Sequence, residues 1–209
     1  MKKFVAVIAA LAALALAGCS SSHPSAASKT GLNDQAGATG KYLGFPLEPA
    51  QPRPQFTLTD TAGKPFAFGT ATAGHPTLLF FGYTNCPDVC PETMADIRLA
   101  LKSLPAELQK KTYVVFVSTD VKRDNAGVIT KWLSYFTPDV QATYVGLRGT
   151  DDQVHAAEAS AHVMLSEEDG QTHSAEVLLF GPDDYAHVAF NSSSNEQQSI
   201  AHDLKVVAG

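Results

Sequence analysis

The sequence of residues 76–94, PTLLFFGYTNCPDVCPETM, places two cysteines between an apolar run and a helical pattern. The unbroken apolar run is typical of a buried central strand. Pro91 lacks a backbone N–H and fits the first turn of a helix but not its interior, so the helix cannot begin much before Asp88. Cys86 and Cys90 therefore lie where a buried strand passes into a helix, with Cys90 in or just before the first helical turn.

Strands and helices alternate along the rest of the chain, as judged from the spacing of apolar residues. The expected elements are a hairpin over 54–69, a strand over 76–84, a helix over 91–104, a strand over 112–120, a helix over 123–136, a strand over 143–147, a helix from about 150, a hairpin of 174–180 with 185–190, and a helix over 194–207. This order predicts an α/β domain with a mixed central sheet and helices on both faces. The cysteine pair at a strand-to-helix junction narrows the prediction to a thioredoxin-like fold with an N-terminal β-hairpin extension.

The N-terminus has the features of an export signal. Lys2 and Lys3 precede an apolar stretch that is too short for a permanent membrane span, and small residues follow it. The string LAGC at 16–19 resembles the bacterial lipobox, in which the cysteine is acylated and becomes the new N-terminus. We therefore expect a lipoprotein signal peptide over residues 1–18 and lipidation at Cys19. The alternative is a plain signal peptide with an incidental cysteine.

Residues 19–51 are rich in Ser, Ala and Gly and lack hydrophobic periodicity, which is typical of a flexible tether. The folded domain is expected over residues 52–209. Acyl chains on Cys19 would hold that domain outside the cytoplasm, on the periplasmic side of a bacterial membrane. The formal net charge is -6, and no basic patch with interleaved aromatic residues is present. Nucleic acid is therefore not expected as a partner.

Cys86 and Cys90 are the only thiols left in the expected domain if Cys19 carries lipid. A static disulfide between them would close a short loop and add little stability. A redox-active pair is the second interpretation, although thioredoxin-like reductases have two residues between their cysteines and CPDVC has three. A metal-binding site is the third interpretation, because thiolates favour Cu(I). Such a site needs one further ligand, typically an imidazole. The helix N-terminus predicts a lowered pKa for Cys90.

His173 is the histidine that we expect nearest to the cysteines. It lies in GQTHSAEVLLF, just before a strand that should run beside the strand leading to the cysteines. Thioredoxins carry a cis-proline at this place, but here no proline occurs from Thr143 until Pro182. The remaining histidines are expected in the tether, at the surface or in packing: His23, His75, His155, His162, His187 and His202.

Three segments resemble the Sco/SenC family, membrane-tethered thioredoxin-like proteins that assist assembly of the binuclear copper centre of cytochrome c oxidase. GYTNCPDVCPETMADI contains the family's C-P-D-V-C-P core, VVFVSTDVKRDNAGVITKWLSYF is similar to its V-S-V-D-P-x-R-D-T-P segment, and THSAEVLLFGPDD is similar to its D-H-S…D-P-x-G stretch. The resemblance runs from about Pro54 to the C-terminus. It departs from the family pattern where Val121 replaces Pro, Asn125-Ala126 replaces Thr-Pro, and Thr172 replaces the Asp before the histidine.

The resemblance implies Cys86, Cys90 and His173 as copper ligands, with Cu(I) as the expected ion and Cu(II) as the alternative. It implies a metallochaperone that delivers copper to, or reduces the cysteines of, the copper-site subunit of cytochrome c oxidase. Other periplasmic copper carriers or thioredoxin-like reductants are further expected partners. No enzymatic activity is implied beyond thiol-disulfide reduction. The alternatives are an extracytoplasmic thiol-disulfide oxidoreductase and a redox or copper sensor that uses the same CxxxC pair. Thr172 lacks a carboxylate that could orient the imidazole, which predicts an effect on copper affinity more than on metal identity.

Overall fold

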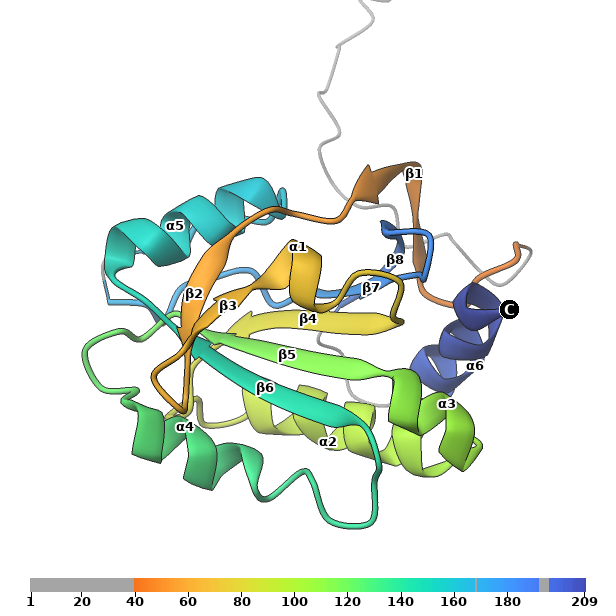
Figure 1. Ribbon diagram of the computed structural model, residues 1–209, viewed down its shortest axis with the longest axis horizontal. Helices are drawn as coiled ribbons and strands as arrows, with labels where there is room; N and C mark the ends of the chain where they lie inside the picture. Colours follow the sequence, from red (N-terminus) through yellow and green to blue (C-terminus); the bar gives the residue numbers. More distant parts are fainter. Residues whose placement is uncertain (1–39, 168, 192–195) are drawn as a thin grey trace, which may run out of the picture. The chain divides into compact units, whose positions relative to one another are not determined.

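The computed structural model describes residues 40–167, 169–191 and 196–209 (Figure 1). These residues form an eight-stranded mixed sheet in the order β1-β8-β7-β4-β5-β6-β2-β3. The strands are β1 Phe45–Pro52, β2 Thr57–Asp60, β3 Pro65–Ala67, β4 Thr77–Gly82, β5 Tyr113–Ser118, β6 Thr143–Arg148, β7 Val177–Phe180 and β8 Tyr185–Phe190. The helices are α1 Phe68–Ala71, α2 Val89–Lys102, α3 Ala106–Lys111, α4 Ala126–Leu133, α5 Asp151–Ser160 and α6 Gln197–Ala208. The predicted mixed sheet, its N-terminal hairpin and its C-terminal hairpin and helix are confirmed, whereas the short helices α1 and α3 were not predicted.

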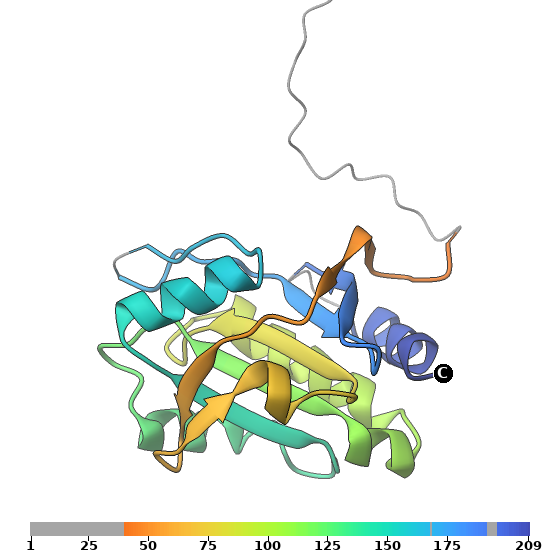
Figure 2. The same ribbon diagram turned by 45° about the horizontal axis from the view of Figure 1, so that its top comes forward.

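β4 is a central strand of the sheet, and its burial on both faces explains why its sequence is apolar throughout. It pairs in parallel with β5 and antiparallel with β7, and all six of its residues are buried. Successive side chains of a strand point to opposite faces. Leu78 and Phe80 accordingly pack in the core beneath α2, α4 and α6, whereas Leu79 and Phe81 pack in the core shared with α1 and α5. Figures 1 and 2 show α5 on one side of the sheet and α2 and α4 on the other.

β1 lies in a segment that the sequence analysis assigned to the tether. It pairs antiparallel with β8 at the edge of the sheet, with Phe45 opposite Ala189. The folded domain therefore begins before the predicted boundary at residue 52. Proline is tolerated in an edge strand, and the three prolines of FPLEPAQP hide the strand pattern. The predicted signal peptide, Cys19 and the tether up to residue 39 lie outside the described residues. Within the described ranges, none of the helices combines the length and apolar content needed to span a bilayer.

Asp203 of α6 forms hydrogen bonds with the backbone just before β1. Its carboxylate is fully buried and accepts the backbone N–H groups of Leu43 and Gly44, with distances of 2.8–3.1 Å. It also lies 2.7 Å from Nδ1 of His202. A buried carboxylate is tolerated only when it is hydrogen-bonded in this way. The C-terminal helix therefore fixes the point at which the N-terminal segment joins the domain.

Replacement of Asp203 should loosen this junction. In Asp203→Ala the buried N–H of Gly44 loses its acceptor, at a cost of about 1–3 kcal/mol in the free energy of unfolding, and the partly buried N–H of Leu43 loses its acceptor as well. Urea unfolding measures this loss, and hydrogen exchange should accelerate at Leu43 and Gly44. The control is Glu107→Ala, which breaks an exposed ion pair with Lys110 on α3 and should leave the unfolding midpoint near that of the wild type. Equal effects of the two substitutions would contradict the assignment.

Candidate metal centre

The two cysteines lie in the connection from β4 into α2. Asp88 caps the helix, with its side chain 2.7 Å from the backbone N of Val89, so α2 begins where Pro91 predicted. Cys90 is the second residue of the helix and is fully buried, whereas Cys86 is partly exposed. The N–H of Cys90 donates to Sγ of Cys86 at 3.4 Å. Both cysteines are free thiols.

The two thiols differ in acidity. Burial raises the pKa of Cys90 and outweighs the hydrogen bond from Tyr83 that lowers it. Desolvation also raises the pKa of Cys86, but hydrogen bonds from Cys90, Asp88 and Tyr83 together bring its pKa below the ordinary thiol value. The prediction of a lowered pKa at Cys90 is therefore wrong. The backbone N–H of Cys90, in the first turn of α2, points at Sγ of Cys86 and stabilises the thiolate of Cys86. Cys90 itself is buried away from water, which disfavours its own thiolate.

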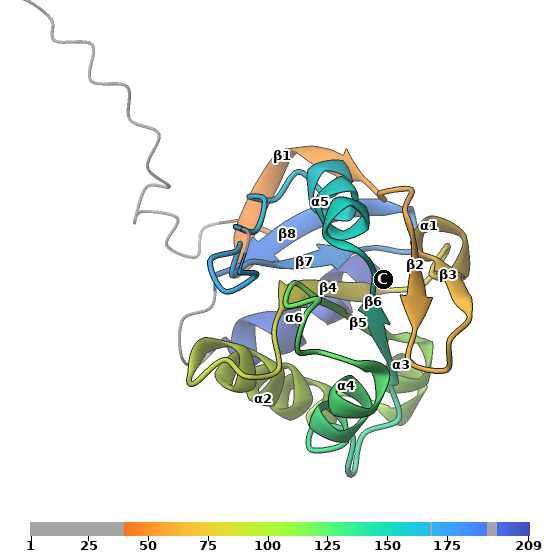
Figure 3. The same ribbon diagram turned by 90° about the vertical axis from the view of Figure 1, so that its left-hand side faces the viewer.

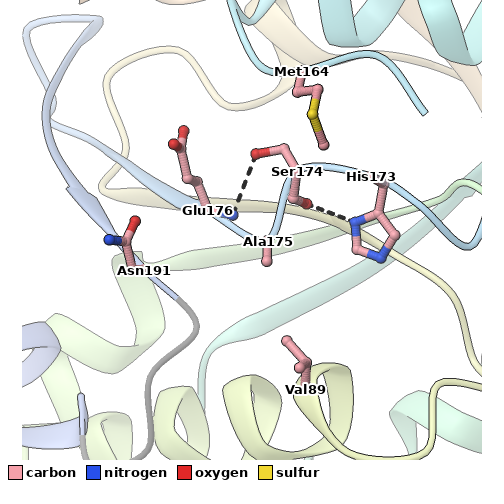
Figure 4. Close-up of a pocket in the computed structure, with 7 residues that line it drawn as sticks. All are labelled: Val89, Met164, His173, Ser174, Ala175, Glu176 and Asn191. Carbon is pink, nitrogen blue, oxygen red and sulfur yellow. Dashed lines mark hydrogen bonds between the residues drawn. The ribbon is translucent and has the colours of Figure 1, made fainter. Parts of the chain in front are cut away.

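His173 faces Cys90 from the segment that precedes β7. Its Nε2 lies 4.0 Å from Sγ of Cys90, and its ring stands edge-on to Tyr83 with the centroids 5.6 Å apart. Nδ1 lies 2.6 Å from the carbonyl oxygen of Ser174, as Figure 4 shows. A carbonyl can only accept, so Nδ1 carries the proton and the lone pair of Nε2 is turned toward Cys90. The carbonyl oxygen of Ser174 thus serves as the acceptor that orients the ring, whereas Thr172 offers no carboxylate for that purpose.

Burial also sets the charge of this imidazole. Desolvation lowers the pKa of His173 and outweighs the hydrogen bond with Ser174 that raises it. The neutral ring is the form that ligates metals. His173 is therefore held in the ligating charge state as well as in the ligating tautomer.

The donor atoms of Cys90 and His173 lie at a separation that a single metal ion could bridge. With zinc-site bond lengths as a guide, a metal ion holds S and N about 3.7 Å apart at trigonal angles and about 4.3 Å apart in a line. The observed 4.0 Å falls between these values. Among the described residues, however, no group of three His, Cys, Asp or Glu side chains is already gathered as a metal site. A three-donor set therefore requires Cys86 to turn from the N–H of Cys90 toward the other two donors.

A buried carboxylate holds the cysteine loop to the neighbouring strand. Asp124 is 1% exposed. It accepts the backbone N–H of Thr84 at 2.9 Å, the hydroxyl of Thr84 at 2.6 Å and the hydroxyl of Ser118 at 2.6 Å. Thr84 precedes Cys86 by two residues, and Ser118 ends β5. Asp124 therefore fixes the start of the cysteine loop to the sheet.

A second buried carboxylate anchors the chain that leads to His173. Glu158 of α5 accepts the N–H and the hydroxyl of Ser166, at 3.0 and 3.1 Å, through one oxygen. Its other oxygen is buried with no hydrogen-bond partner within the described residues. Desolvation raises the pKa of Glu158, and the hydrogen bonds from Ser166 offset this only in part. This carboxyl is therefore easier to protonate in the folded chain than in the unfolded one.

The sequence analysis missed Asp124, Thr84, Glu158 and Ser166. Polar residues of these types are mostly exposed, and no local pattern shows which of them are buried. For Asp124 the sequence offered one indication, because Arg123 and Asp124 match the Arg-Asp of the family segment. That match shows a shared motif, but it does not show that Asp124 contacts the cysteine loop.

A cavity of about 400 Å³ opens beside His173 (Figure 4). Its lining combines the first turn of α2 with the segment before β7 and the end of β8: Val89, Met164, His173, Ser174, Ala175, Glu176 and Asn191. Met164, which lines the cavity, is 57% exposed, so this side of the cavity faces solvent. The candidate centre can therefore be reached from outside on the side of the imidazole.

The other histidines of the described ranges lie elsewhere. Nδ1 of His75 is 3.1 Å from the carbonyl oxygen of Lys111, and Nε2 of His187 is 2.8 Å from Asp183. The remaining described histidines lie in or just after helices α5 and α6: His155, His162 and His202. His23 lies outside the described residues. Among the six histidines that the structure describes, His173 is the one placed beside Cys90, where the sequence analysis expected it.

Comparison with known proteins identifies the family. The SCO1/SenC family model matches residues 46–209. The chain belongs to the SCO1/SenC family. The predicted thioredoxin-like α/β fold is confirmed by solved SCO1/SenC structures, and the match begins within β1, which agrees with the early start of the folded domain.

Three of the proteins that the chain matches illustrate the similarity. A Stutzerimonas stutzeri protein whose name proposes that it binds copper is 34% identical over 136 residues, covering 62% of this chain and 64% of that protein. Bradyrhizobium japonicum ScoI, solved with copper bound, is 31% identical with a TM-score of 0.60, covering 74% of this chain and 98% of that one. Yeast Sco1 with copper bound is 26% identical with a TM-score of 0.62, covering 74% and 87%. The chain spans less than two thirds of the length of the curated relatives that it matches first.

Alkylation should distinguish the two thiols. The reduced full-length chain, treated with iodoacetamide for timed intervals at neutral pH, should be labelled at Cys86 first because that thiol is partly exposed and its pKa is lowered. Cys90 should react only after urea unfolds the domain. Peptide mass spectrometry measures both rates, and Cys86→Ser controls for labelling that Cys86 assists. Equal rates in the folded wild type would refute the described asymmetry.

The stability of the domain should depend on pH through Glu158. Its raised pKa means that the folded state binds a proton more tightly than the unfolded state, so this stabilising contribution is present below the unfolded pKa and is lost as pH rises through the folded pKa. Glu158→Gln, which stays neutral, should therefore be more stable than the wild type at neutral pH, with the difference shrinking toward pH 4. Thermal unfolding at several pH values measures this. A difference that is constant with pH would contradict it.

Proposed function

We propose that this SCO1/SenC protein is a membrane-tethered copper metallochaperone that delivers copper to, or reduces the cysteines of, the binuclear copper site of cytochrome c oxidase. The observation that carries the proposal is the approach of His173 Nε2 to Cys90 Sγ at 4.0 Å, with Cys86 in the same loop. The copper-bound structures of ScoI and Sco1 support copper as the ion.

The donor types favour Cu(I) as cargo. Two thiolates and one imidazole form a soft ligand set, which suits Cu(I) better than hard divalent cations. The imidazole of His173 is neutral with Nε2 available, so it binds without first losing a proton. Cys86 and Cys90 must lose their thiol protons as the ion enters. Oxidation of the pair to a disulfide removes both sulfur donors, which couples copper occupancy to the redox state of the cysteines.

The proposed location follows from the N-terminal sequence. On this proposal Cys19 of the LAGC string carries a lipid, and the tether connects that anchor to the domain on the periplasmic side of a bacterial membrane. Proteins within reach of such a tether are the proposed partners. They are the copper-site subunit of cytochrome c oxidase, other periplasmic copper carriers, and thioredoxin-like reductants that return Cys86 and Cys90 to thiols.

Copper titration tests the proposed ligand set. The reduced full-length chain, titrated with Cu(I) against a competing chelator, should bind one equivalent. Cys86→Ser, Cys90→Ser and His173→Ala should each weaken binding, and the cysteine variants should lose most because each removes an anionic donor. The control is His75→Ala, which removes an imidazole that contacts Lys111 and Tyr113 and should bind as the wild type does. Wild-type affinity in His173→Ala would refute the ligand assignment.

The asymmetry of the thiols supports a second candidate function, thiol-disulfide exchange. The Cys86 thiolate would attack a disulfide of a substrate protein and release one of its sulfurs as a thiolate. Cys90 would then attack Cys86, releasing the second substrate thiol and leaving a Cys86–Cys90 disulfide, so that two electrons pass to the substrate. Disulfide reduction that survives His173→Ala would favour this function over copper transfer.

A further inference from the structure

Thr119, which directly follows β5, contacts both parts of the chain that meet at the candidate centre. It is 3% exposed. Its N–H donates to the carbonyl oxygen of Gly82 at 2.8 Å, and Gly82 ends β4 just before the cysteine loop. Its hydroxyl oxygen lies 2.5 Å from the carbonyl oxygen of Gly170, three residues before His173. One buried residue therefore joins the strand that leads to the cysteines, through its backbone, and the segment that carries the imidazole, through its side chain.

The contact at Gly170 is close and depends on glycine. Gly170 has φ +68, a conformation that other residues rarely adopt, and a Cβ there would lie 2.2 Å from the backbone oxygen of Thr119. Its N–H is also engaged, donating to the carbonyl oxygen of Glu167 at 2.8 Å. The segment before His173 therefore packs in direct contact with the backbone of Thr119, just after β5. Figure 3 looks onto this edge, where the green segment after β5 lies beside the end of β4.

The same short stretch also holds the cysteine loop. Asp124 lies five residues after Thr119 and binds Thr84 by two hydrogen bonds, as described above. The chain from Thr119 to Asp124 thus contacts the cysteine loop at one end and the histidine segment at the other. Neither Thr119 nor Asp124 is a proposed ligand.

We propose that Thr119 is a positioning residue, whose hydroxyl holds the segment before His173 against the end of β5 and so keeps the imidazole over Cys90. The hydroxyl has one proton, and the carbonyl of Gly170 at 2.5 Å is nearer than that of Gly82 at 3.2 Å. In Thr119→Val a methyl group replaces the hydroxyl. Carbon-to-oxygen contacts need about 3.3 Å, so the histidine segment must withdraw by roughly 0.8 Å. The consequence for copper binding rests on the function proposed above.

The position of His173 can be measured without copper. Because its ring lies edge-on to Tyr83, its proton resonances in the reduced full-length chain carry a ring-current shift. Thr119→Val should change that shift, and Thr119→Ser, which restores the hydroxyl, should return it toward the wild-type value. The matched control is Thr112→Val, which removes a fully buried hydroxyl bonded to Leu108 before the opposite end of β5. It should lower stability without moving the His173 signal.

Copper affinity gives the second readout. Thr119→Val should weaken Cu(I) binding by roughly 10- to 100-fold, as loss of a group that orients a ligand does. In a His173→Ala background the same substitution should cause little further loss, because there is no imidazole left to position. A full additional loss in that background, or wild-type affinity in Thr119→Val, would overturn the inference.

The two readouts separate this inference from the proposed function. A wild-type chain that binds no Cu(I), with a His173 signal that still depends on Thr119, contradicts the metallochaperone and supports the positioning role. A wild-type chain that binds Cu(I), with a His173 signal that is unchanged in Thr119→Val, overturns the positioning role and leaves the metallochaperone standing.

Discussion

Antiparallel pairing of β4 with β7 brings the candidate centre together. The register places Phe80 opposite Val177, so the chain that leaves the end of β4 emerges beside the chain that enters β7. The first of these segments continues to the cysteines and the second contains His173. Cys90 and His173 are 83 residues apart in sequence, and no local interaction could hold them at 4.0 Å. The entropy lost in closing so long a loop is offset by burial of the strands themselves, since β4 and β7 are buried along their whole lengths.

Burial then gives the donors their chemical character. Cys90 is removed from water and kept protonated, whereas Cys86 takes the N–H of the first helical turn and ionises more readily. His173 is neutral because it is desolvated, and its tautomer is fixed by the carbonyl of Ser174. The carboxylate that the family resemblance places before the histidine is therefore not needed here to orient the ring. A backbone acceptor performs that task, and it does so whichever side chain occupies position 172.

The sequence was sufficient wherever the determining interaction is local or periodic. The apolar run of β4, the limit that Pro91 sets on the start of α2, and the start of α5 at about residue 150 are all short-range features. His173 could be predicted because the order of strands in the fold class places it beside the cysteines. The sequence failed where the outcome depends on tertiary burial. The prolines of β1 concealed its strand pattern. The pKa of Cys90 is raised by burial, although its place at a helix N-terminus predicted a lowered pKa. Asp124 and Thr119 are buried, but nothing in the sequence distinguishes them from surface residues.

The cysteine loop and the histidine segment are held in place in different ways, and on the proposed function this difference bears on how copper would be released. Cys90 lies in the first turn of α2, a fourteen-residue helix, and the loop that contains Cys86 is fixed by the buried carboxylate of Asp124. The histidine segment is held at separate points, by Ser166 on Glu158 and by Gly170 on Thr119, and a cavity lies against it. On the proposed function, an incoming set of donor atoms meets the imidazole and the partly exposed Cys86 before it meets Cys90. The buried thiol then retains the ion until the other bonds have been exchanged, so copper need not pass through solvent.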